Sequence, residues 1–137
     1  MQLEDARVLV IDDNAQIRML IAKVLSPLVA GVHECDSAIT ALPEWLSYEP
    51  HLIFVDYEMP EINGVTFIKV IRALESRSEQ RTPIIMVTAH SERDCVLAAA
   101  EAGADGFVIK PLSAEAIVGR AAQALAGVAD NCVLLPV

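Results

Sequence analysis

The chain has 137 residues, which suits one domain with a single core, and 54% of them are hydrophobic, which excludes a disordered protein. Its net charge of −9, with no run of Lys or Arg, argues against direct nucleic-acid binding. The apolar runs are too short to span a membrane, the first residues lack the apolar core of a signal peptide, and the three cysteines are widely spaced. These features predict a cytoplasmic protein with no membrane partner.

Short apolar runs alternate with longer stretches of helical periodicity. In chain order they predict a strand over 8–11, a helix over 17–25, a weaker strand over 32–35, a helix over 38–46, a strand over 52–55, a helix over 65–74, a strand over 84–87, a helix over 92–102, a strand over 107–109 and a helix over 114–126. Because most strand runs are continuously apolar, both of their faces are expected to be buried, as in a parallel sheet. We predict one α/β domain over residues 1–127, followed by a short tail over 128–137.

Several residues predict where the helices begin and end. Asn14, Ser91 and Ser113 are placed to cap the first, fourth and fifth helices through their side-chain oxygens. Pro27 is expected to stop the first helix. Pro43 lies inside the second predicted helix and indicates a kink or a late start there.

The residues at the ends of the predicted strands carry reactive groups. The first strand closes on Asp12-Asp13, the third on Asp56, the fourth on Thr88, and the fifth is followed by Lys110. In an open parallel sheet, ligands bind outside the carboxyl ends of the strands. One aspartate at such a position is more often a turn former, but four strand ends with carboxylates, a hydroxyl and an amine are hard to explain as turns. We therefore expect these groups to form one site.

The chemistry of this group of residues favours a divalent cation and a phosphoryl group. Clustered carboxylates repel and need a counter-charge, and Mg²⁺ with oxygen ligands is the natural choice. A carboxylate such as Asp56 beside Mg²⁺ can attack a phosphoryl group and form an aspartyl phosphate. Lys110 is placed to neutralise the transferring oxygens, and the Thr88 hydroxyl can donate to one of them.

Four motifs in this order resemble the response-regulator receiver family across about residues 6 to 126. They are Val8–Asn14 (VLVIDDN), Asp56–Gly64 (DYEMPEING), Val87-Thr88-Ala89 and Lys110-Pro111. The resemblance implies a flavodoxin-like, doubly wound fold, in which a five-stranded parallel sheet of order 2-1-3-4-5 is flanked by five helices.

The resemblance also implies roles for the acidic residues. Asp56 is the phosphoacceptor. Asp13 binds Mg²⁺ directly together with Asp56, Asp12 assists through water, and the backbone carbonyl of Glu58 completes the protein ligands. Lys110 is the catalytic amine that covers the charge of the phosphoryl group.

Further roles concern the response to phosphorylation. The resemblance makes Thr88 the catalytic and switch hydroxyl and Phe107 the switch aromatic that moves with it. It implies a cis Lys110–Pro111 bond, which proline tolerates. In this family the residues at the positions of Glu58 and His90 influence autodephosphorylation.

The implied function is that of a signalling module. It takes a phosphoryl group from a phosphohistidine on a sensor histidine kinase or a histidine phosphotransfer protein, and later removes it, so it is no conventional enzyme. An unknown output protein would read the face of the fourth and fifth strand–helix units, which is also a candidate surface for homodimer formation. We expect a single-domain regulator or shuttle with no output domain of its own, with a domain cut from a larger protein as the alternative.

Two other classes of function compete with this interpretation. A Mg²⁺-dependent phosphohydrolase would also use Asp56 as an aspartyl nucleophile, and Glu58 two residues later would offer an acid/base, but no substrate-binding insertion is evident. A flavin-binding electron carrier would need a Ser/Thr/Gly-rich phosphate loop after the first strand. The acidic pair there repels phosphate unless a metal is bound.

Overall fold

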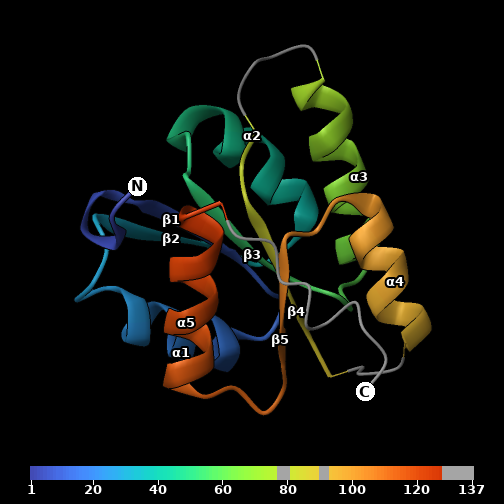
Figure 1. Cartoon of the computed structure of the whole chain (residues 1–137). Helices are drawn as coiled ribbons and strands as arrows, with labels where there is room; N and C mark the ends of the chain where they lie inside the picture. The colour runs from blue at the N-terminus through green and yellow to red at the C-terminus, as the bar shows by residue number, and fades with distance from the viewer. Residues whose placement is uncertain (77–80, 90–92, 128–137) are drawn as a thin grey trace.

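Five parallel strands form one sheet in the order β2-β1-β3-β4-β5, as Figure 1 shows. The computed structural model describes residues 1–76, 81–89 and 93–127. The elements are, in chain order, a 3₁₀ turn η1 (Leu3–Asp5), β1 (Arg7–Ile11), α1 (Ala15–Leu25), β2 (Gly31–Cys35), α2 (Ala38–Tyr48), β3 (Leu52–Asp56), α3 (Gly64–Glu75), β4 (Ile84–Thr88), α4 (Arg93–Ala102), β5 (Gly106–Ile109) and α5 (Ala114–Leu125). The predicted doubly wound α/β fold and its strand order are confirmed.

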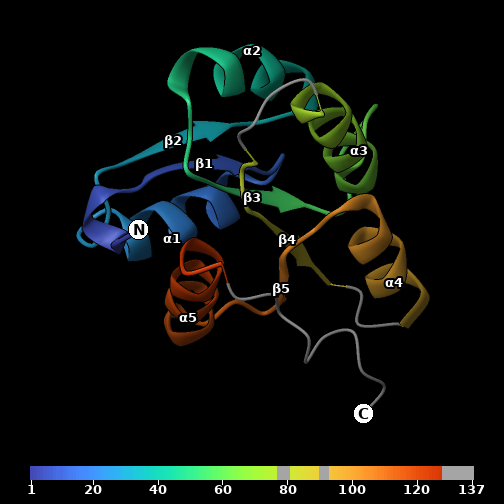
Figure 2. The same ribbon diagram turned by 45° about the horizontal axis from the view of Figure 1, so that its top comes forward.

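The helices cover both faces of the sheet, with α1 and α5 on one face and α2, α3 and α4 on the other (Figure 2). Successive strand residues point to opposite faces, so Leu9 and Ile11 belong to one core cluster while Val8 and Val10 belong to the other. The central strand β3 is buried at all five positions. The continuous apolar runs in the sequence are the consequence of this two-sided burial.

The predicted element boundaries that fall on described residues lie within two residues of the observed ones. The side chains of Asn14 and Ser113 cap α1 and α5 as predicted, by accepting from backbone N–H groups of the first turn. The predicted cap at Ser91 lies outside the described residues. The helix that contains Pro43 begins at Ala38, so the alternative of a late start is wrong. Pro43 is exposed and cannot donate to the carbonyl one turn earlier, which leaves that carbonyl available to water.

The part of the chain that the structure describes contains no helix with the length and apolar character needed to cross a bilayer.

Arg72 on α3 connects the segments at the amino end of the sheet. Its guanidinium donates to the carbonyls of Thr82 (2.8 Å) and Gly103 (2.8 and 3.1 Å), and it pairs with the carboxylates of Glu75 (2.6 Å) and Asp105 (2.9 Å). Arg72 is 17% exposed and Glu75 only 7%. These contacts hold the approaches to β4 and β5 against α3 and satisfy groups that water barely reaches.

The first prediction concerns this arginine. Replacing Arg72 by Met leaves two carboxylates and two carbonyls short of a donor, so we expect a loss of about 2–4 kcal/mol in the free energy of unfolding. Arg81 also contacts Asp105 (2.6 Å) and Gly103 (3.2 Å), but it is 53% exposed, so Arg81→Met should cost less than about 1 kcal/mol. Urea unfolding followed by circular dichroism measures both values. Equal losses for the two variants would contradict the role given to Arg72.

Candidate functional site

The register of the parallel strands brings the predicted site residues to one edge of the sheet. Ile11 pairs with Val55, so Asp12 and Asp56, the next residue of each strand segment, lie side by side. Thr88 pairs with Ile109, so Lys110 follows directly beside Thr88. The backbone N–H of Lys110 donates to the Thr88 carbonyl at 2.8 Å and extends this pairing by one residue.

A cavity of about 260 Å³ opens at this edge of the sheet. It is lined by Asp12, Asp13, Asn14, Asp56, Tyr57, Glu58, Thr88, Ala89 and Lys110. The structure therefore brings together the predicted carboxylates, hydroxyl and amine, with Glu58 at their margin. Phe107 lies apart from the cavity, because it is 3% exposed and belongs to the core on the α2–α4 face of the sheet.

Three carboxylates and one ammonium group dominate the electrostatics of this cavity. Oxygen atoms of Asp12, Asp13 and Asp56 lie within 4.8 Å of one another. The Lys110 Nζ donates to Asp56 Oδ1 at 3.1 Å and lies 3.8 Å from Asp12 Oδ2. Among the described residues that line the cavity, Lys110 is the one cationic side chain, so the carboxylates exceed the positive charge.

Burial makes this excess of negative charge costly. Asp12 is 1% and Asp56 4% exposed. Burial, reinforced by the nearby Asp12 charge, raises the pKa of Asp56 to about 6, although the Lys110 ammonium opposes this shift. Burial also raises the pKa of Asp12, and the hydrogen bond from the Asn14 backbone partly offsets it. The charged forms of both aspartates are therefore destabilised in the folded protein, and a bound cation would relieve this cost.

One atom of the site indicates which kind of cation fits. Asp12 Oδ2 is buried and has no hydrogen-bond partner within the described structure. A buried carboxylate oxygen without a partner is costly, and it is explained by a ligand that the oxygen faces. Carboxylate oxygens from Asp12, Asp13 and Asp56, with no His or Cys lining the cavity, suit a hard cation such as Mg²⁺. The donor set fits the metal that the sequence predicts.

The position of Asp12 is fixed by contacts that the sequence did not indicate. The Asn14 backbone N–H donates to Asp12 Oδ1 at 2.8 Å, and the Arg18 guanidinium donates to the Asp12 carbonyl at 2.6 Å. The Asp12 N–H donates to the Cys35 carbonyl of β2 at 3.1 Å. Asn14 was predicted only as a helix cap. Arg18 could have been suspected from the sequence only because it is a basic residue one turn into the helix that follows Asp12-Asp13.

Thr88, the Lys110–Pro111 bond and Phe107 are the next predicted features of the site. Thr88 ends β4 and is 2% exposed. The Lys110–Pro111 peptide bond is cis. The carbonyl of Phe107 accepts a hydrogen bond from Arg120 Nε of α5 at 3.0 Å. His90, which the resemblance linked to autodephosphorylation, lies outside the described residues.

The loop after Asp56 is folded back onto the end of β3. The Tyr57 N–H donates to the Val87 carbonyl at 2.9 Å, and the Gly64 N–H donates to the Tyr57 carbonyl at 3.0 Å. Asn63 caps α3 through its side chain. A Cβ at position 64 would collide with the backbone carbonyl oxygen of Asp56, so glycine alone permits this close approach.

Comparisons with known proteins agree with the observed fold. The family model of the response regulator receiver domain matches residues 8–122. The chain is 33% identical over 112 residues to the chemotaxis protein CheY of Pseudomonas aeruginosa, covering 81% of this chain and 89% of the relative. It is 31% identical over 113 residues to CheY of Bacillus subtilis, covering 82% and 91%.

A solved structure of the chemotaxis response regulator CheY4 of Vibrio cholerae superposes with a TM-score of 0.80 at 25% identity, covering 88% of this chain and 98% of that one. The sheet order and the acidic edge thus define a receiver module of two-component signalling. The chain belongs to the response regulator receiver domain family.

The second prediction tests the close approach at Gly64. Gly64→Ala forces the Asp56 carbonyl and the following loop to move, so we expect a loss of about 1–3 kcal/mol in unfolding free energy and weaker Mg²⁺ binding. In the control Gly119→Ala, the new Cβ on α5 meets no atom within 4 Å, and it should stabilise the protein by about 0.5–1 kcal/mol. Chemical denaturation and metal titration measure both effects. A Gly64→Ala variant as stable as the wild type would contradict this prediction, because the loop after Asp56 could then move at no cost in free energy.

The third prediction concerns pH in the absence of metal. The pKa of Asp56 is about 6 in the folded protein, above its ordinary value of 3.8, so the folded state binds more protons between these pH values. The unfolding free energy should therefore fall, on the order of 2 kcal/mol, as pH rises from about 4 to about 7. Asp56→Asn should remove much of this fall.

The measurement is denaturant unfolding in EDTA across this pH range, for wild type and Asp56→Asn. Excess Mg²⁺ at pH 7 should raise the stability of the wild type, because the metal binds the folded state. A wild-type stability that rises with pH in EDTA would contradict the assignment of a raised pKa to Asp56.

Proposed function

We propose that Asp56 accepts a phosphoryl group from a phosphohistidine on a sensor histidine kinase or a histidine phosphotransfer protein. The observation that carries the proposal is the Lys110 Nζ at 3.1 Å from Asp56 Oδ1, inside a cavity that opens at the carboxyl edge of the sheet. Asp12, Asp13 and Asp56 would hold Mg²⁺, with the backbone carbonyl of Glu58. The bound metal would supply positive charge at the phosphoryl oxygens.

The proposed reaction moves one phosphoryl group between two protein side chains. A carboxylate oxygen of Asp56 attacks phosphorus, an O–P bond forms, and the N–P bond to the donor imidazole breaks. The electron pair of that bond stays on the imidazole nitrogen, and the imidazole leaves as the neutral ring because its other nitrogen carries a proton. With a pKa of about 6, Asp56 is largely ionised at neutral pH and available as the nucleophile. The Lys110 ammonium group, 3.1 Å from Asp56 Oδ1, would cover the negative charge gained at the site.

The proposed signal starts at Thr88. Its hydroxyl would donate to a phosphoryl oxygen, and such a charge-assisted bond contributes about 1.5–3 kcal/mol. This is enough to bias a switch between two conformations that differ by a few kcal/mol. Phe107, now buried in β5, would respond, and an output protein would read the surface of α4, β5 and α5. The same surface is the candidate for pairing between two copies of the chain.

The fourth prediction tests the phosphoacceptor directly. Incubation with acetyl phosphate and Mg²⁺ should add the mass of one phosphoryl group, and alkali should release it, as an acyl phosphate requires. Asp56→Asn should abolish the adduct, and EDTA should prevent it. The matched control is Asp36→Asn, because Asp36 follows β2 at the same edge but does not line the cavity.

The outcomes separate the competing functions. An unmodified wild type, or an adduct that survives Asp56→Asn, overturns the proposal. Steady hydrolysis of a small phosphate ester through Asp56, without a donor protein, would instead identify a phosphohydrolase.

A further inference from the structure

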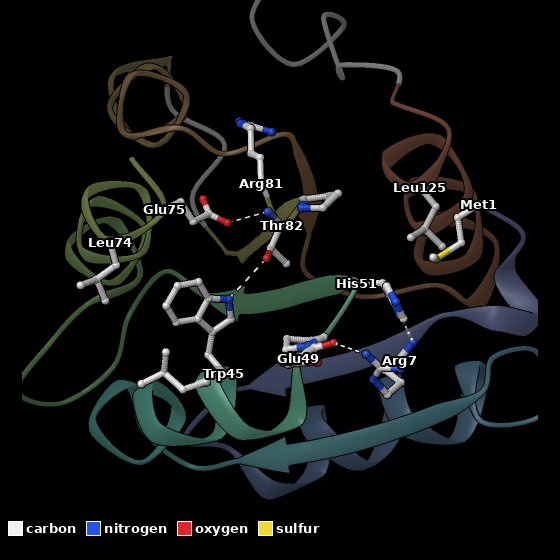
Figure 3. A pocket seen from close by; sticks show the side chains of 13 residues that line it. Met1, Arg7, Trp45, Glu49, His51, Leu74, Glu75, Arg81, Thr82 and Leu125 are labelled. Atoms are coloured by element: carbon white, nitrogen blue, oxygen red, sulfur yellow. Dashed lines mark hydrogen bonds between the residues drawn. The ribbon is translucent and has the colours of Figure 1, made fainter. Parts of the chain in front are cut away.

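A second, larger cavity of about 520 Å³ lies at the opposite edge of the sheet (Figure 3). Arg7 at the start of β1 and Thr82 just before β4 mark its floor. Trp45 of α2, Leu74 of α3 and Leu125 of α5 line it from three helices that end at this edge. We call this cavity the amino-edge groove. The proposed phosphorylation site lies at the other end of the strands, so the groove has no part in it.

The polar groups of the amino-edge groove are largely used within the domain. The Arg7 guanidinium donates to the carbonyls of Tyr48 (3.0 Å) and Glu49 (2.7 Å), and the Arg7 N–H donates to His51 Nδ1 at 2.9 Å. The Trp45 indole N–H contacts the Thr82 hydroxyl at 3.4 Å (Figure 3). These contacts engage the polar groups on the floor of the groove, while the charged side chains of Glu49 and Arg81 at its border are exposed.

The apolar side chains at the rim, by contrast, face solvent. Leu46 is 66%, Met1 60% and Leu74 48% exposed. Together with Trp45 and Leu125 they give the amino-edge groove an apolar border on several sides. Exposed apolar side chains grouped around a concave surface mark a binding site for an apolar segment.

We propose that the chain's own segment 132–137 (Cys-Val-Leu-Leu-Pro-Val) binds in the amino-edge groove. The segment carries no charged side chain. It starts five residues after Gly127, and Leu125, the last residue of α5, already lines the groove. Since extended chain covers about 3.3 Å per residue, the segment begins within about 17 Å of Gly127. A connection of this length is sufficient for the proposed binding with α5 as it stands, because α5 already ends at the groove.

The tether favours this occupant over a second copy of the chain. A segment joined to its binding site by a few residues has an effective concentration in the millimolar range, far above ordinary protein concentrations. The groove lies at the amino edge, so its occupant leaves Asp56 accessible. The proposal therefore stands or falls independently of the phosphoacceptor function.

Trp45 provides the test, because it is the only tryptophan of the chain and lines the groove. In the full chain, the double variant Leu134→Asp/Leu135→Asp should shift Trp45 emission to longer wavelength, increase its quenching by acrylamide and move its indole N–H resonance. The matched control Val128→Asp/Ala129→Asp adds the same charge to the tail outside the apolar segment and should leave Trp45 unchanged.

The groove side is tested with Leu74→Asp, which should produce the same emission shift in the wild-type chain. It should add little in the Leu134→Asp/Leu135→Asp background, because the two changes disrupt one contact. Phosphorylation by acetyl phosphate should be unaltered in all variants. If Trp45 emission and quenching are the same in Leu134→Asp/Leu135→Asp as in the wild type, the proposal is overturned. A signal in the wild type that changes with protein concentration also overturns it, because the segment would then bind a second copy.

Discussion

The parallel register of the sheet is the constraint on which the site depends. Because all five strands run in the same direction, their carboxyl ends meet at one edge, and the pairing of Ile11 with Val55 makes Asp12 and Asp56 neighbours. No loop conformation can separate them, since Asp56 is the last residue of β3 and Asp12 directly follows β1. The site is therefore built with more negative charge than Lys110 can balance, and the sheet itself imposes the need for a cation.

The two edges of the sheet differ in how far their buried polar groups are satisfied within the domain. At the amino edge Arg72 satisfies carbonyls and carboxylates from α3, β4 and β5, and its contacts are saturated within the domain. At the carboxyl edge Asp12 Oδ2 is buried and has no hydrogen-bond partner in the described structure, although Lys110 Nζ lies 3.8 Å away. A ligand at this edge would complete the contacts of this oxygen. The contacts of Arg72 at the amino edge thus hold in place the strands whose carboxyl ends carry the reactive residues.

The fold and the core of the site were predictable because their signals are local. Continuous apolar runs predicted buried parallel strands, and Asp56 and Thr88 could be placed because each ends such a run. Arg18 could not be placed, because its contact with the Asp12 carbonyl depends on how α1 packs. The helix around Pro43 was predicted from Ala38 onward, and only the alternative of a late start, which followed from local propensity, is wrong. Packing of α2 on the sheet outweighs one missing hydrogen bond.

Lys110 shows how a change of charge could be transmitted. Its ammonium group contacts Asp56, while its backbone N–H donates to the carbonyl of Thr88. Three residues earlier, the Phe107 carbonyl is held by Arg120 of α5. The backbone of this segment is therefore tied on both sides, to β4 and to α5. In the proposed function, a phosphoryl group on Asp56 would change the partners of the Lys110 and Thr88 side chains more readily than it would move the strands. The response is then expected in side-chain conformation at Thr88 and Phe107, on a sheet that keeps its register.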